Sequence, residues 1–222
     1  MPTVGLVCTG QSPSDDVRPE MAGLLPPGTQ IIERGALDDV TPGELSRMTP
    51  AAGDTVLVTR LRSGAEVRLA EARLGPFLRR AAAELRGQGA DLVAVLCTGT
   101  LAGTGWPGPV LLPGPIVRGL AAAMTTRGSR LAVLVPAADQ QEDARAEWAS
   151  LTGRLRVMAA SPYRGPDEIA AAAEALARWR PDLVVLDCLG FDRSAQCLVR
   201  DSVRVPVLLP RTVLAGAIAA LL

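Results

Sequence analysis

The sequence predicts an α/β fold of two pseudo-symmetric halves, each built around a parallel β-sheet. A nine-residue stretch occurs twice without a gap, as Asp91-Leu-Val-Ala-Val-Leu-Cys-Thr-Gly99 and as Asp182-Leu-Val-Val-Leu-Asp-Cys-Leu-Gly190. An alanine-rich helical pattern precedes each copy, at residues 77–86 and 169–178. Short Val/Leu-rich runs alternate with helical patterns along the chain, which is typical of parallel strands covered by helices on both faces. The repeat therefore predicts one helix–strand–cysteine unit in each half.

In the first half, strands are expected where short apolar runs stand between Gly, Pro and Asp residues. Thr41-Pro-Gly-Glu44 is a capping box with proline at the first helical position, so it predicts a helix start. Gly87-Gln-Gly89 ends the long helix before the first cysteine strand. The predicted strands are 3–8, 30–33, 54–59, 92–96 and, shorter, 66–69 and 110–112, and the predicted helices are 15–25, 42–48 and 70–86.

The second half follows a segment at 98–115 that is rich in Gly, Pro and Thr, which predicts a loop and crossover. Pro206 favours an edge or starting position for the last strand. The predicted strands are 130–135, 155–159, 183–187 and 205–209, and the predicted helices are 115–125, 139–151, 166–179, 194–202 and 212–222. The predicted division is 1–112 plus 207–222 for the first half and 113–206 for the second.

Composition narrows the classes of protein. The 222 residues are 48% hydrophobic, enough for a sizeable core, and 23 basic residues balance 23 acidic ones. Neither a nucleic-acid nor a membrane partner is expected, because there is no basic surface signal and no apolar run of spanning length. The N-terminus has no basic leader pattern, so a cytoplasmic protein with reduced thiols is expected. The expected partner is a small-molecule carboxylate, and a homodimer is compatible with the sequence.

The chain contains no histidine, lysine or asparagine. It therefore has no imidazole base, no Ser-His-Asp triad, no Schiff-base lysine and no Walker lysine. Its four cysteines match no zinc-binding spacing, so neither a metal nor a cofactor is predicted. Acid–base work at neutral pH is left to Cys, Asp, Glu, water and the single tyrosine, Tyr163.

Cys97 and Cys188 each follow a predicted buried strand. Parallel sheets bind ligands at the carboxyl ends of their strands, so both thiols are expected at a binding site. Free N–H groups of a nearby helix N-terminus would stabilise a thiolate there. Two thiols on opposite sides of one carbon can invert it, since one removes a proton and the other returns one to the far face. The alternative for each cysteine is a small residue of the core.

Polar residues at other strand ends predict a binding site for the carboxylate of a substrate. The loop after the first strand offers hydroxyls and backbone N–H groups, and its alternative role is a tight turn. Arg60 directly follows a strand and can clamp a carboxylate, or else carry a solvated charge. Tyr163 is expected on a loop at the same edge, where surface packing is the favoured role. The predicted substrate-binding residues are Thr9, Gly10, Gln11, Ser12, Arg60, Thr98, Gly99 and Thr100.

Four motifs together resemble the AroM family. They are Thr9-Gly-Gln-Ser-Pro-Ser-Asp-Asp-Val17, Leu57-Val-Thr-Arg-Leu-Arg-Ser-Gly64, Leu186-Asp-Cys-Leu-Gly-Phe191 and Val205-Pro-Val-Leu-Leu209. AroM-like proteins look related to the aspartate/glutamate racemase superfamily. The resemblance implies two flavodoxin-like halves, an active-site cleft between them and one catalytic cysteine from each half.

By this resemblance Cys97 and Cys188 occupy the two catalytic positions, although their neighbours differ from the racemase pattern. Thr98 and Gly99 follow the first cysteine where racemases usually have Asn-Thr, and Leu189 follows the second where they usually have Thr. The implied function is a cofactor-independent racemase or epimerase of a small carboxylic or amino acid. The alternatives are a decarboxylase or cis–trans isomerase of the same superfamily, or a non-catalytic metabolite-binding protein.

Overall fold

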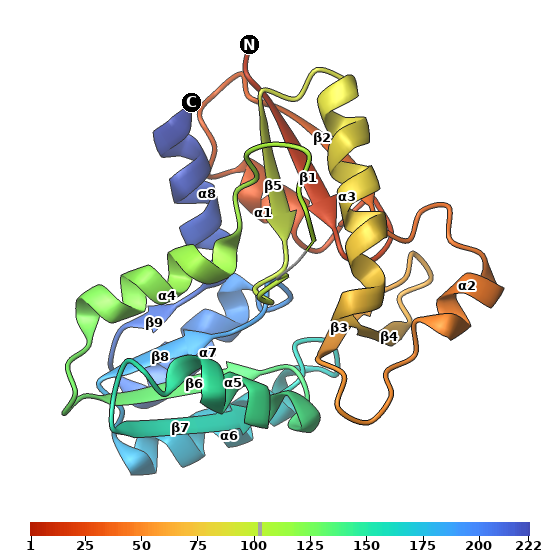
Figure 1. The fold of residues 1–222 in the computed structure, drawn as a ribbon. Helices are drawn as coiled ribbons and strands as arrows, with labels where there is room; N and C mark the ends of the chain where they lie inside the picture. Colours follow the sequence, from red (N-terminus) through yellow and green to blue (C-terminus); the bar gives the residue numbers. More distant parts are fainter. Residues whose placement is uncertain (102–103) are drawn as a thin grey trace. The chain divides into compact units, whose positions relative to one another are not determined.

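The computed structural model describes residues 1–101 and 104–222, in which strands and helices alternate (Figure 1). The chain divides into two compact units. The first comprises Met1–Pro113 with Leu214–Leu222, and the second comprises Gly114–Val213. The chain thus enters the second unit once and returns to the first at its C-terminus. The loop predicted at 98–115 includes residues 102–103, which lie outside the described residues.

The first unit is built on a parallel three-stranded sheet and an antiparallel pair. Its elements are β1 (Thr3–Cys8), α1 (Arg18–Ala22), β2 (Gln30–Gly35), α2 (Pro42–Arg47), β3 (Val56–Arg60), β4 (Glu66–Ala70), α3 (Glu71–Gly87) and β5 (Leu92–Leu96). The sheet has the order β2-β1-β5, and β3 pairs with β4. Cys8, the last residue of β1, pairs with Gly35 on one side and with Leu96 on the other, so the carboxyl ends of these strands meet at one edge.

The second unit is built on a parallel four-stranded sheet in the order β7-β6-β8-β9. Helices connect the strands, as βαβ crossovers require. Its elements are α4 (Pro113–Met124), β6 (Arg130–Val135), the 3₁₀ turn η1 (Ala138–Gln140), α5 (Gln141–Trp148), β7 (Arg154–Ala159), α6 (Pro166–Trp179), β8 (Leu183–Leu186), α7 (Arg193–Val203) and β9 (Val207–Leu208), after which α8 (Pro210–Leu221) leads back to the first unit.

The two units have matching strand orders, which confirms the predicted α/β class with two similar halves. β1, β2 and β5 correspond to β6, β7 and β8, and an isolated parallel bridge between Ala94 and Leu111 occupies the position of β9. A second repeat marks this fourth position, because Pro109-Val-Leu-Leu-Pro113 matches Pro206-Val-Leu-Leu-Pro210. Each copy ends on the proline that begins a helix, α4 or α8, where proline needs no N–H partner.

Some predicted elements differ from those in the structure. The strand predicted at 54–59 is not part of the parallel sheet, because β3 and β4 are joined by five residues, too few for a parallel crossover. The turn is closed by the N–H of Leu61 donating to the carbonyl of Ala65. The helix predicted at 15–25 is shorter, since Ser14 accepts from two N–H groups in a turn and Pro19 stands in the first helical turn.

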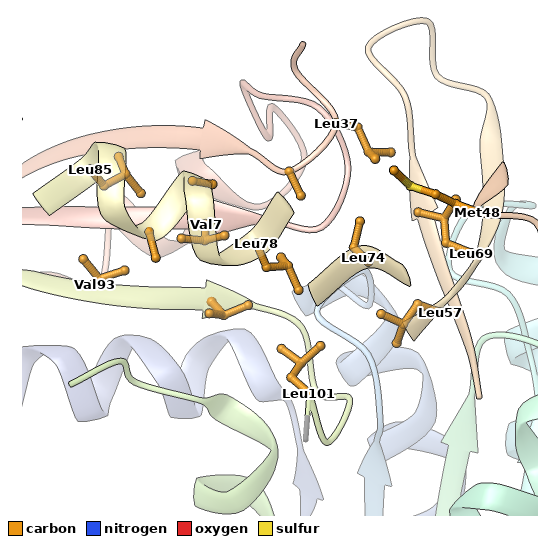
Figure 2. Packing of buried hydrophobic residues seen from close by; sticks show 14 residues of the cluster. Val7, Leu37, Met48, Leu57, Leu69, Leu74, Leu78, Leu85, Val93 and Leu101 are labelled. Carbon is orange, nitrogen blue, oxygen red and sulfur yellow. The ribbon is translucent and has the colours of Figure 1, made fainter. Parts of the chain in front are cut away.

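The apolar face of α3 fills the core of the first unit (Figure 2). Leu74, Leu78 and Leu85 are fully buried and belong to one cluster with Val7 of β1 and Val93 of β5. Spacings of four and seven residues place these leucines on one helix face. Burial of each such side chain stabilises the fold by about 1.5–3 kcal/mol. Helix α3 is therefore held rigidly on the sheet, and so is its first residue, Glu71.

Candidate functional site

Cys97 stands immediately after β5, in a turn with Thr98 and Gly99, the first cysteine turn. The strand is buried up to Leu96, whereas the Cys97 side chain is only half-buried. The backbone N–H of Gly99 donates to Cys97 Sγ at 3.3 Å. This hydrogen bond favours the thiolate over the thiol, because it stabilises negative charge on sulfur.

A buried carboxylate lies against the first cysteine turn. Glu71 is the first residue of α3, is 9% exposed, and accepts a hydrogen bond from Thr100 Oγ1 to Oε1 at 3.0 Å. A Cβ atom placed on Gly99 would lie 3.1 Å from Glu71 Oε2 and 3.3 Å from Cys97 Sγ. The missing side chain of Gly99 thus leaves room for the carboxylate and the sulfur to approach the same point. The sequence-based site did not include Glu71, although its position close to the end of the strand predicted at 66–69 was a signal.

Cys188 stands two residues after the end of β8, in the second cysteine turn, which it forms with Leu189 and Gly190. The N–H of Gly190 donates to Cys188 Sγ at 3.3 Å, the same bond at the same distance as in the first turn. The partner beside it differs, because Tyr163 Oη lies 3.9 Å from Cys188 Sγ. A Cβ atom on Gly190 would overlap the Tyr163 hydroxyl, so glycine is required for the phenol to reach the thiol.

Burial raises the pKa of the Cys188 thiol from its ordinary 9.0 to about 11. The Gly190 N–H, the Tyr163 hydroxyl and the charge of Arg211 all lower this pKa, but together they do not offset the desolvation. The nearby charge of Asp187 raises it further. Cys188 therefore holds its proton at neutral pH and is suited to donate one.

Arg211 holds the second cysteine turn in place through hydrogen bonds to its backbone carbonyls. Its side chain is 1% exposed, and its Nε and Nη2 donate to the carbonyl of Leu189 at 3.1 and 2.7 Å, with Nη2 also 3.1 Å from the carbonyl of Gly190. Charge-assisted bonds of this kind are about twice as strong as neutral ones. The sequence-based site missed Arg211. Its only signal in the sequence is a difference between the two Pro-Val-Leu-Leu-Pro copies, because Arg211 follows the second copy where Gly114 follows the first.

Asp187 does not share the turn with Cys188, although it precedes that residue directly. Its Oδ2 accepts a hydrogen bond from the indole of Trp148 at 2.8 Å. Trp148 is buried on α5. Asp187 therefore helps to anchor α5 to the sheet, and the alternation of side chains along a strand gave this direction in advance.

The loop predicted to cradle a carboxylate has protein partners for much of its hydrogen-bonding capacity. Thr9 is buried and its hydroxyl donates to that of Thr59 at 3.0 Å. Gly10 packs so closely against the carbonyl of Arg60 that a side chain at position 10 would overlap it. Gln11 donates to the carbonyl of Leu37 at 3.3 Å and accepts from the N–H of Arg62 at 2.9 Å, while Ser12 donates through N–H and Oγ to Asp38 at 2.7 and 2.6 Å.

Arg60 ends β3 with a side chain that is 40% exposed. Its Nη1 lies 3.7 Å from Asp16 Oδ2 and its Nε donates to the carbonyl of Gly64 at 3.3 Å. Thr98 is half-buried and Thr100 is exposed, apart from its bond to Glu71. The structure thus gathers Cys97, Gly99, Thr100 and Glu71 at one point of the first unit. The binding roles of Thr9–Ser12, Arg60 and Thr98–Thr100 stay predictions.

Within 1–101 and 104–222, no three His, Cys, Asp or Glu side chains are grouped as metal ligands. Across the same residues, no helix has the length and apolarity needed to cross a membrane.

Solved structures with the same arrangement define the class of fold. An allantoin racemase from Klebsiella pneumoniae matches with a TM-score of 0.70 at 14% identity, covering 100% of this chain and 87% of that one. An unliganded arylmalonate decarboxylase matches at 0.59 and 18% identity, covering 100% and 93%. A glutamate racemase from Aquifex pyrophilus matches at 0.55 and 13% identity, covering 99% and 84%. The chain therefore has the two-domain α/β fold of these racemases and decarboxylases.

The family follows from the sequence. Residues 4–222 match the family model described as AroM protein, so the chain belongs to the AroM family. None of the curated proteins compared with it matches in sequence.

Proposed function

We propose that this protein is a cofactor-independent enzyme that racemises or epimerises a small carboxylic or amino acid, with Cys97 and Cys188 as paired acid and base. The observation that carries the proposal is the matched pair of cysteine turns. Each thiol stands after an equivalent strand and accepts an N–H from the glycine two residues on, at 3.3 Å in both turns. A core cysteine needs no such repeated donor.

The chemistry assigns opposite roles to the two thiols in the first half of the reaction. Cys97 as thiolate takes the proton from the carbon next to the carboxylate, and the electron pair moves into the carboxyl group. Cys188, which keeps its proton because burial raises its pKa to about 11, then gives that proton to the opposite face. The product has inverted configuration, and the two thiols have exchanged protonation states.

The fold shared with racemases and with arylmalonate decarboxylase supports this class of reaction but not a particular substrate. Thr9–Ser12, Arg60 and Thr98–Thr100 are proposed to hold the carboxylate. None of the four cysteines, all of them among the described residues, forms a disulfide, which favours action in a reducing cytoplasm.

Decarboxylation is the second candidate, and the raised pKa of Cys188 favours it. That reaction needs a proton donor for the carbanion left by CO₂, and a thiol that holds its proton is such a donor. It needs no second base, so Cys97 would be dispensable for it.

Deuterium exchange separates these functions. The reduced protein is incubated in D₂O with a panel of chiral amino acids, hydroxy acids and aryl-substituted malonates, and the α-carbon is followed by NMR. Incorporation with inversion supports the racemase, whereas CO₂ release with a single deuterium supports the decarboxylase. Binding of panel members without exchange or CO₂ release would overturn both and support a metabolite-binding protein.

A further inference from the structure

The carboxylate of Glu71 is buried in a way that requires an explanation. The residue is 9% exposed, and its Oε2 has no hydrogen-bond partner among the described residues. A buried carboxylate oxygen without a donor is costly, and a proton on that oxygen or shared with it removes the cost. Oε1 is already occupied by the hydroxyl of Thr100 at 3.0 Å.

The group that can supply this proton is the Cys97 thiol. Glu71 Oε2 and Cys97 Sγ lie 3.1 and 3.3 Å from the same point, the place where a Gly99 Cβ would stand. The two atoms are thus no farther apart than the sum of those distances. Leu57 Cδ2 lies 3.0 Å from that point, so an apolar side chain borders the space that the carboxylate and the sulfur share.

Other charged groups on the surrounding elements have partners of their own. On α3, Arg73 pairs with Asp54 at 3.1 Å and Arg79 donates to the carbonyl of Thr104. At the end of β3, Arg60 lies 3.7 Å from Asp16. At the end of β1, the Cys8 thiol lies 3.8 Å from Glu33, and burial raises its pKa well above the ordinary range.

We propose that Glu71 is the proton acceptor for Cys97, so that carboxylate and thiol share one proton and one negative charge. The transfer breaks the S–H bond of Cys97, forms an O–H bond on Glu71 Oε2 and moves the negative charge from oxygen to sulfur. The charge stays at the N-terminus of α3, whose dipole stabilises an anion. This rests on the proposed function, in which Cys97 must become a thiolate although the chain has no histidine.

The test measures the two thiol properties that this pairing moves in opposite directions. A carboxylate beside a thiol opposes the negative charge of the thiolate. Glu71→Gln should therefore make iodoacetamide alkylation of Cys97 about tenfold faster at pH 7, read by peptide mass spectrometry across pH 6–10. The same variant should nevertheless lower α-carbon deuterium exchange about 100-fold, because the proton that Cys97 takes from the substrate in each cycle has lost the acceptor through which it leaves the thiol.

Controls separate this role from a structural one. Glu174→Gln removes an exposed carboxylate on α6 and should change neither rate. Glu71→Asp keeps the acid and should leave the alkylation profile close to that of the original chain. Glu71→Met suits a buried position and repeats the alkylation test should the amide disturb folding, which circular dichroism reports.

An alkylation rate that is unchanged or slower in folded Glu71→Gln or Glu71→Met overturns the proposal. A fall in both alkylation and exchange has the same meaning, since damage to the turn lowers both. If no acid in the panel is turned over, the proposed function fails, while the alkylation profile still decides whether Glu71 and Cys97 form a pair.

Discussion

The two cysteine turns share a backbone but differ in the side chains that surround the thiol. In both, a glycine N–H donates to sulfur at 3.3 Å. Because the same glycine has no side chain, another side chain can occupy the space beside the sulfur. In the first turn that space is approached by a carboxylate, Glu71. In the second it is approached by the Tyr163 hydroxyl, and a buried guanidinium, Arg211, bonds the turn from beneath.

This difference gives the two thiols different proton chemistry on one scaffold. A carboxylate accepts a proton, whereas a phenol and a guanidinium donate hydrogen bonds. The repeat therefore supplies two equivalent positions for sulfur. Cys188 holds its proton because burial raises its pKa more than Tyr163 and Arg211 lower it, whereas the first turn has a carboxylate, Glu71, as the proposed proton acceptor of Cys97. A symmetric reaction such as racemisation can run on such an asymmetric pair, because each catalytic cycle exchanges the two protonation states.

The largest effect is expected from the cysteines themselves. Cys97→Ser and Cys188→Ser should each lower racemisation about 1,000-fold, since serine is too weak an acid to replace a thiol. Cys188→Ser should retain α-carbon exchange without inversion, because Cys97 still removes the proton. Polarimetry and NMR measure the two quantities. Cys197→Ser, on α7, is the matched control and should retain full activity. Full racemisation by either single variant would show that the turns are not partners.

The next effect concerns stability of the second turn. Arg211→Met should lower the free energy of unfolding by about 3 kcal/mol, because the carbonyls of Leu189 and Gly190 lose their charged donor. Urea denaturation measures this loss. Arg200→Met, at a 54% exposed side chain of α7, is the control and should change stability by less than about 0.5 kcal/mol. Equal losses of unfolding free energy in the two variants would show that Arg211 does not stabilise the turn.

Sequence reasoning reached the cysteines and the fold because both follow from local patterns. The repeat placed each thiol after a strand, and periodicity placed the helices between strands. The partners of the thiols depend on contacts between distant residues. Tyr163 was expected on its loop, but only the space left by Gly190 brings it 3.9 Å from Cys188. Arg211 bonds carbonyls 22 residues earlier, which no local pattern predicts.

The same limit applies to the first unit. The substrate-binding role of Ser12 stays a prediction, but its hydrogen bonds to Asp38, 26 residues away, had no signal in the sequence. Glu71 directly follows β4, which pairs antiparallel with β3. The sequence analysis predicted parallel strands and so did not predict this pair. Side chains at strand ends can thus be predicted as a group, whereas their individual partners depend on the tertiary fold.

A third prediction tests the protonation state of the second thiol. Because burial raises the pKa of Cys188 to about 11, its thiolate is scarce below that pH. At pH 8 its alkylation should be about 100-fold slower than that of the same cysteine in the urea-unfolded chain, and it should rise steeply from pH 9 to 11. Peptide mass spectrometry gives both rates. A folded rate equal to the unfolded one would mean that Cys188 is not held as the acid.

The smallest effect tests why the second turn needs glycine. Gly190→Ala should displace the Tyr163 hydroxyl from Cys188, and Tyr163→Phe should delete it, so each should lower racemisation about tenfold. Both should also raise the pKa of Cys188, since the hydroxyl lowers it. If the phenol is the reason for the glycine, the double variant should be no worse than either single one. Additive losses of racemisation would instead show that Gly190 is needed for the backbone conformation of the turn. Tyr163 would then be an independent contributor, and the two cysteine turns would differ less than their surroundings indicate.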